Sequence, residues 1–220
     1  NGDPSITAPS GSPFSRNTDT GSAFYTTQGT EFNPTFSDNC TVTARNNYNN
    51  SSTLAGATFP VGTTLVTWTA TDASNRTATC QIQVVITDNQ DPVISHCPNA
   101  TVSQTADLAK CYFEVPGAEY DPYGFSDNNG LQKLTYQIGS GPEVGTDLTT
   151  TLAGVQIPVG TTGTPTTTVT WRLYDLSNRV GTTCQTVLTI TDPQPPIVVA
   201  VSNQNRLTDA GQPDYTVVSG

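Results

Sequence analysis

The chain has 220 residues, of which 34% are hydrophobic and 12% are charged, and 18 acidic against 8 basic residues give a formal net charge of −10. Binding to nucleic acid or to an anionic membrane surface needs a basic patch, and the few scattered Lys and Arg residues exclude both functions. No apolar run approaches the roughly 18 residues of a membrane-spanning helix, so no direct membrane insertion is expected.

The predicted elements of the first half are short strands separated by turns. Residues 60–64 are predicted to form a turn that enters a strand at 65–71. This strand and a second at 78–86 alternate bulky and polar residues with period two, and the turn signal at 72–75 joins them. The pair is typical of the last hairpin of a β-sandwich, and Trp68 is expected to fill its core.

In the second half, residues 93–95 are predicted as the first strand after a junction at Asp91-Pro92, and residues 112–115 as the next. No segment has helical apolar spacing over ten residues. Short strands at regular intervals with many turn residues predict an all-β fold of tandem immunoglobulin-like β-sandwich domains arranged end to end.

An internal repeat is the strongest signal in the sequence, because seven blocks of the first half recur in the same order in the second. The paired blocks are 36–39 and 125–128, 54–56 and 152–154, 60–64 and 158–162, 66–68 and 169–171, 72–76 and 175–179, Cys80 and Cys184, and 86–88 and 190–192. A five-residue insertion near 163–165 is expected to lengthen a hairpin loop of the second copy.

Three similar junctions at Pro4, Pro92 and Pro196 mark where the repeats begin. They divide the chain into a first repeat (1–91), a second repeat (92–194) and the first strands of a third (195–220), with a strand expected at 214–218. This organisation predicts that the chain is a piece of a longer array.

The repeats contain a set of short motifs, which are Cys97-Pro98, Asp38-Asn39-Cys40, Phe59-Pro60-Val61-Gly62-Thr63-Thr64, Val66-Thr67-Trp68-Thr69-Ala70-Thr71-Asp72, Cys80 and the junction 88–92. Together these motifs resemble the hyalin repeat (HYR) family. The resemblance implies immunoglobulin-like sandwiches without catalytic activity, in large extracellular or cell-surface adhesion proteins.

The family pattern also implies two disulfides, Cys40 with Cys80 and Cys97 with Cys111. In the second repeat the position that matches Cys40 is Asn129, so Cys184 has no obvious partner and is predicted to be a small buried side chain. None of the five cysteines has the C-x₂-C spacing of a zinc site.

Strand direction predicts one candidate metal site. The turns that hold Asp127 and Asp175 should lie at the end of the second sandwich where its first strand enters, facing Asp88 and Asp91 of the junction. Several converging oxygens suit Ca²⁺. Alternatively, each Asp side chain caps its own turn. In the first repeat Asp3, Asp38 and Asp72 would face a preceding junction in the same way.

The expected function is a non-catalytic stalk and adhesion module of a long extracellular or cell-surface adhesin. Its expected partners are other repeats of the same chain or neighbouring subunits, with surface glycans or proteins as candidate ligands. Two alternatives stay open: a filament subunit that assembles by strand addition through residues 195–220, and accessory repeats of a secreted hydrolase. The only histidine, His96, has no recognisable nucleophile and carboxylate with which to form a catalytic triad.

Overall fold

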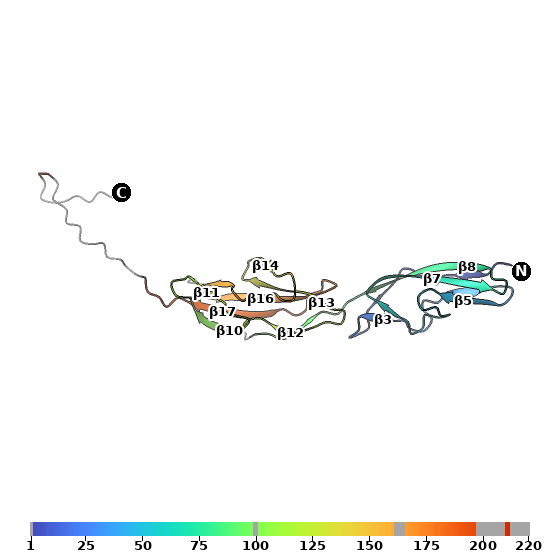
Figure 1. Ribbon diagram of the computed structural model, residues 1–220, viewed down its shortest axis with the longest axis horizontal. Coiled ribbons are helices and arrows are strands. Elements are labelled where there is room, and N and C mark those ends of the chain that lie inside the picture. The colour runs from blue at the N-terminus through green and yellow to red at the C-terminus, as the bar shows by residue number, and fades with distance from the viewer. Residues whose placement is uncertain (1, 99–100, 161–165, 197–209, 212–220) are drawn as a thin grey trace.

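The computed structural model describes residues 2–98, 101–160, 166–196 and 210–211. Figure 1 shows two β-sandwiches that follow one another along the long axis, with a short connection between them. All regular elements of the described residues are strands, and this part of the chain contains no helix that could span a membrane. The predicted all-β fold is therefore confirmed.

The first repeat forms a sandwich of eight strands. One layer is a four-stranded sheet in the order β2-β8-β7-β5, and the other consists of the pairs β1–β4 and β3–β6. The strands are β1 (Ser5–Thr7), β2 (Phe14–Asn17), β3 (Phe24–Thr26), β4 (Thr35–Ser37), β5 (Val42–Asn46), β6 (Thr58–Pro60), β7 (Gly62–Asp72) and β8 (Thr77–Thr87).

The second repeat has the same strand order with one addition, β14, at the edge of its larger sheet. That sheet runs β10-β17-β16-β13-β14, and the pairs β9–β12 and β11–β15 form the other layer. The strands are β9 (Val93–His96), β10 (Thr101–Thr105), β11 (Tyr112–Glu114), β12 (Tyr123–Ser126), β13 (Leu131–Ile138), β14 (Glu143–Val144), β15 (Gln156–Pro158), β16 (Thr166–Asp175) and β17 (Cys184–Thr191).

The predicted hairpin of the first repeat is confirmed as β7–β8, which is longer than expected. β7 begins at Gly62, within the stretch predicted as a turn, and Thr63 and Thr64 pair with Val85 and Val84. The turn prediction for residues 60–64 was therefore wrong except at Val61. Threonine favours strands, and the two residues extend the ladder already set by β8.

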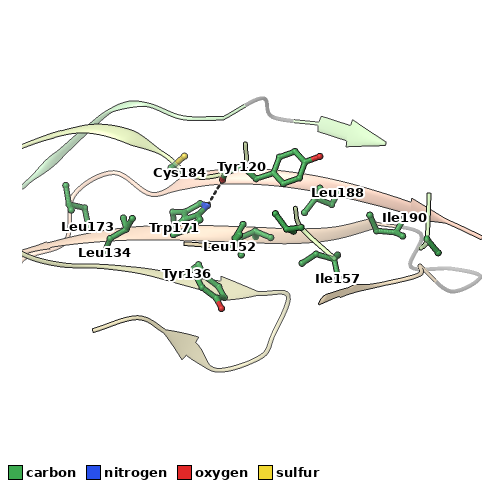
Figure 2. Close-up of a cluster of buried hydrophobic side chains, with 13 residues drawn as sticks. Tyr120, Leu134, Tyr136, Leu152, Ile157, Trp171, Leu173, Cys184, Leu188 and Ile190 are labelled. Atoms are coloured by element: carbon green, nitrogen blue, oxygen red, sulfur yellow. Dashed lines mark hydrogen bonds between the residues drawn. The ribbon is translucent and has the colours of Figure 1, made fainter. Parts of the chain in front are cut away.

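Each repeat has its own core built around one tryptophan, because inward positions alternate with outward ones along the central strands. Trp68 and Trp171 are completely buried, as predicted for Trp68. In β16 the inward residues are Val169, Trp171 and Leu173. Figure 2 shows Trp171 in the middle of the second core, where its Nε1 donates to the carbonyl of Tyr120 at 3.2 Å.

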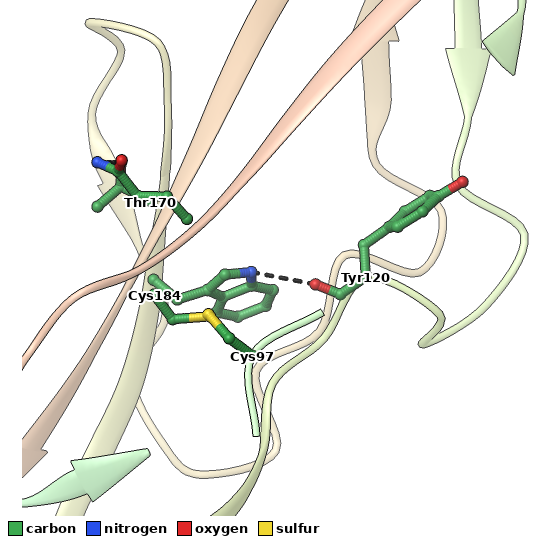
Figure 3. The surroundings of a disulfide bond; sticks show 6 residues. Cys97, Tyr120, Thr170 and Cys184 are labelled. Atoms are coloured by element: carbon green, nitrogen blue, oxygen red, sulfur yellow. Dashed lines mark hydrogen bonds between the residues drawn. A yellow bond between two sulfur atoms is a disulfide. The ribbon is translucent and has the colours of Figure 1, made fainter. Parts of the chain in front are cut away.

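The disulfide predictions were wrong. Figure 3 shows that Cys97 bonds to Cys184, with 5.7 Å between their Cα atoms. Cys97 follows β9 and Cys184 begins β17, so the bond joins the two layers of the sandwich. Cys111 is exposed and free, because β10 first carries the chain along β17 by five residue pairs, about 15 Å.

The predicted Cys40–Cys80 bond is not formed either, and both thiols are free. Cys80 lies opposite Trp68 in the β7–β8 ladder. Cys40 lies in the loop before β5, whose first residue pairs with Asp72. The two cysteines are therefore at different levels of the sandwich, at least four residues apart along β7, about 13 Å.

Two predictions lie outside the described residues. These are the inserted hairpin loop around 163–165, and the strand expected at 214–218 in the segment that was predicted to begin a third repeat.

Candidate metal centre at the junction of the two repeats

Residues 88–92 join β8 to β9, and Gln90 attaches this linker to the first repeat. Its Oε1 accepts a hydrogen bond from the backbone N–H of Gly21 at 2.6 Å. Its Nε2 donates to the hydroxyl of Thr18 at 3.0 Å and to the carbonyl of Asp19 at 3.2 Å. One amide therefore uses both its donor and its acceptor groups to hold the linker against the first sandwich.

Side chains of the second repeat hold the linker from the other side. Asn128 Nδ2 donates to the carbonyl of Ser22 at 2.8 Å and to Asp88 Oδ1 at 3.1 Å. Arg179 forms an ion pair with Asp91, at 2.6 Å from its terminal nitrogen and 2.8 Å from Nε. These bonds leave the linker little freedom to swing.

Gly181 of the second repeat packs directly against Pro92 of the linker. A Cβ atom on residue 181 would lie 1.8 Å from the carbonyl oxygen of the buried Pro92, a distance that real contacts do not reach. The second repeat can therefore pack on the linker in this way only with glycine at position 181.

Three aspartates, Asp88, Asp127 and Asp175, lie where their strands end near the junction. Each takes the next inward-facing position after a core residue of its strand. Asp88 comes two residues after Ile86, Asp175 two after Leu173, and Asp127 two after Phe125. Because side chains alternate with period two, each carboxylate turns to the same face as the core residue before it. Asp88 is 2% exposed, Asp175 is fully buried, and Asp127 is half-buried.

The three carboxylates converge on one another. One oxygen from each of Asp88, Asp127 and Asp175 lies within 4.8 Å of the other two. In each of the three carboxylates, one oxygen accepts hydrogen bonds. Asp127 Oδ2 accepts from two backbone N–H groups of its own turn. Asp175 Oδ1 accepts likewise from two, and Asp88 Oδ1 from the N–H of Gln90 and from Asn128.

Burial and mutual repulsion oppose the ionised state of these neighbouring carboxylates. Burial raises the pKa of the Asp175 carboxyl above its ordinary value, the N–H groups of Arg179 and Ser177 act against this, and the charges of Asp127 and Asp88 raise the pKa further. Nearby like charges in a buried site destabilise the ionised forms. A bound cation would remove this repulsion.

The structure thus brings together three of the four residues predicted from the sequence and leaves Asp91 outside the group, paired with Arg179. Gln90 and Asn128 were not among the residues predicted from the sequence. Asn128 belongs to the repeated block 125–128, which was a usable signal. Gln90 gave a weaker one, the equivalent position of Gln194 after the second repeat.

The first repeat lacks a comparable group in the part of the chain that the structure describes. There the turn aspartate, Asp72, forms an ion pair with Arg76 at 2.9 Å, and the same arginine contacts Asp3 at 3.1 Å. In the second repeat the equivalent arginine, Arg179, pairs with Asp91.

His96 lies on an exposed strand and stacks on Tyr123, with 4.4 Å between the ring centroids. Its Nδ1 is 3.0 Å from the hydroxyl of Ser95. That hydroxyl also contacts the carbonyl of Gly124 at 2.7 Å, and a carbonyl can only accept, so the hydroxyl proton points away from the imidazole. The pair is therefore not arranged as a base and an activated nucleophile.

Residues 4–86 match the HYR domain, which confirms the resemblance that the motifs predicted. Two curated relatives are similar: "Sushi, von Willebrand factor type A, EGF and pentraxin domain-containing protein 1" of Rattus norvegicus and of Mus musculus. Each is 35% identical over 74 residues, or 34% of this chain. The match spans only 2% of the length of these relatives.

Among solved structures, the fibronectin(III)-like modules of Clostridium thermocellum CbhA have a TM-score of 0.39 and 11% identity, covering 90% of this chain and all of theirs. A protocadherin gammaB7 EC3-6 structure has a TM-score of 0.37 and 14% identity, covering 86% of this chain and 51% of its own.

Proposed function

We propose that this chain is a non-catalytic spacer and adhesion module of an extracellular or cell-surface protein, in which successive β-sandwiches are held end to end. The HYR match supports an adhesion-type module. The bond between Cys97 and Cys184 supports an oxidising compartment, where disulfides persist. The partners of the module would be other repeats of the same chain or neighbouring subunits.

The observation that carries the proposal is the two-sided attachment of the linker. A freely jointed connection would leave residues 88–92 in solvent, and Gly- or Ser-rich linkers behave in that way. Here Gln90 binds the first repeat, while Asp88, Asp91 and Pro92 contact the second. The repeats therefore keep a fixed relative direction, which a spacer needs to display a distal surface.

The same attachment recurs after the second repeat. Gln194 Oε1 accepts from the N–H of Ala109 at 2.9 Å, and its Nε2 donates to the carbonyl of Asp107 at 3.2 Å. Gln194 thus binds the second repeat as Gln90 binds the first. Because the same hydrogen bonds occur after both repeats, they support a linker that serves to join successive repeats end to end, rather than a contact made only once.

Small-angle X-ray scattering of the whole chain tests the proposal with Gly181→Ala and the control Gly117→Ala. The added methyl group at 181 meets a backbone carbonyl, whereas at 117 it meets only the end of the Glu119 side chain, at 3.1 Å. We expect the wild type and Gly117→Ala to scatter as one extended shape, and Gly181→Ala to have a shorter maximum dimension. Wild-type scattering typical of freely reorienting sandwiches would refute the fixed junction.

A further inference from the structure

The carboxylates of the junction have the spacing of ligands around a single ion. Two oxygens bound to one Ca²⁺ at about 2.4 Å lie at most about 4.8 Å apart. One oxygen from each of Asp88, Asp127 and Asp175 lies within 4.8 Å of the other two, so each pair meets the spacing that a shared ion requires.

Each of these aspartates has one carboxylate oxygen without a hydrogen-bond partner. Asp88 Oδ2, Asp127 Oδ1 and Asp175 Oδ2 are buried atoms that accept no hydrogen bond. Asp88 and Asp175 are themselves more than nine-tenths buried. Buried polar atoms are almost always hydrogen-bonded, so three bare carboxylate oxygens at one place indicate that something else binds there.

Asn128 adds a fourth oxygen of the same kind. Its Nδ2 donates to two acceptors, the Ser22 carbonyl and Asp88 Oδ1, which fixes the orientation of the amide. Its Oδ1 is also buried and without a partner. An amide oxygen is a regular ligand of Ca²⁺.

Among the residues that the structure describes, no Lys or Arg side chain pairs with Asp88, Asp127 or Asp175. Arg179, the basic residue of the nearest turn, is paired with Asp91, and the remaining hydrogen bonds to the three carboxylates come from backbone N–H groups and Asn128. These hydrogen bonds offset part of the negative charge, but two buried carboxylates and a half-buried one at the same place still repel one another.

The oxygens without partners identify the class of ion. The site offers carboxylate and amide oxygens, with no histidine or cysteine in the group, which suits hard cations and not zinc. Three carboxylates and an amide oxygen suit Ca²⁺, which takes six to eight oxygen ligands in a flexible geometry, better than Mg²⁺, which keeps several waters and binds through one or two carboxylates. Asp127 and Asn128 also line a surface hollow of about 300 Å³, through which an ion can enter.

We propose that the junction binds one Ca²⁺ through Asp88, Asp127 and Asp175, with Asn128 as a further oxygen ligand. Asp88 comes from the linker, whereas Asp127 follows β12 and Asp175 ends β16 of the second sandwich. The ion would therefore connect the linker to the second repeat and stiffen the spacer, so its biological role rests on the function proposed above. Ion binding itself does not depend on that function.

Isothermal titration of the EDTA-treated full chain with CaCl₂ tests the site directly. We expect one ion per chain, with a dissociation constant of about 10⁻⁴ to 10⁻³ M, as in other extracellular modules. Asp127→Asn should weaken binding at least about tenfold, because an anionic ligand is lost. The matched control is Asp38→Asn, the same residue of the equivalent turn, where Asp38 Oδ2 accepts from Cys40 N–H as Asp127 Oδ2 accepts from Asn129. The control should bind as the wild type does.

Wild-type protein that takes up no Ca²⁺ at about 10 mM, well above the weakest expected affinity, overturns the proposal whatever the variants do. Equal weakening by Asp38→Asn and Asp127→Asn overturns the assignment to these residues. MgCl₂ that binds as tightly as CaCl₂ overturns the choice of ion. Scattering without Ca²⁺ separates this proposal from the spacer function, because a junction that stays extended but binds no Ca²⁺ refutes only the ion site.

Discussion

The Cys97–Cys184 bond should make the stability of the two repeats respond differently to reduction. The bond closes a sequence separation of 87 residues across the layers of the second sandwich, while the free thiols Cys40 and Cys80 leave the first without a crosslink. The loop-entropy relation gives about 4–5 kcal/mol for a loop of this length, and native disulfides in small secreted domains typically contribute about 2–5 kcal/mol.

Cys97→Ala is the suitable perturbation. Cys97 is exposed, whereas Cys184 is 3% exposed and contributes to the core, so this change removes the bond and keeps the packing. We expect the free energy of unfolding of the second repeat to fall by about 2–5 kcal/mol. The first repeat should be unchanged.

The two tryptophans allow each repeat to be followed separately, since each core contains one of them. In a Trp68→Phe background, urea unfolding monitored by fluorescence reports on Trp171 and the second repeat. In a Trp171→Phe background it reports on Trp68 and the first. Reductant added to the parent of each background should reproduce the effect of Cys97→Ala in the second repeat only.

Two results would refute this reasoning. A second repeat with the same stability in oxidising and reducing buffer would mean that Cys97–Cys184 does not hold its layers together. A first repeat that loses stability on reduction would mean that Cys40 and Cys80 are bonded after all.

Two further predictions concern single side chains. Trp171→Phe should lower the free energy of unfolding by about 1–2 kcal/mol more than Trp68→Phe, measured by urea unfolding followed by circular dichroism. The reason is that Trp171→Phe leaves the Tyr120 carbonyl without its donor, whereas the buried Nε1 of Trp68 has no partner to lose. Equal losses in the two variants would contradict this. In the first repeat, burial raises the pKa of Glu31, but hydrogen bonds including those from Arg16 outweigh it and leave this pKa below its ordinary value. Glu31→Gln should therefore lower the free energy of unfolding of the first repeat by about 1–2 kcal/mol at pH 7. The difference from wild type should disappear as the pH falls from about 4.3, the ordinary pKa of Glu, through the lowered pKa of the folded state. A difference in stability that persists at pH 2 would contradict this prediction.

The local elements and their order follow from patterns within the amino-acid sequence. Period-two alternation predicted the strands around Trp68, and the same alternation turns Asp88 and Asp175 toward the core side of their strands. The repeated blocks matched Asp127 and Asp175 of the second repeat with Asp38 and Asp72 of the first. These features depend on neighbours a few residues apart, so the chain encodes them locally.

Contacts between residues far apart in the sequence depend on how the strands pair and pack. The family pattern implied Cys97 with Cys111, but the parallel pairing of β10 with β17 carries Cys111 far along the sandwich and leaves Cys97 opposite Cys184. Likewise, Asp91 is close to Asp88 in the sequence, yet its ion pair with Arg179 keeps it out of the group of three carboxylates. A disulfide or an ion site needs its atoms within a few ångströms, and that distance depends on strand pairing and linker packing rather than on spacing along the chain.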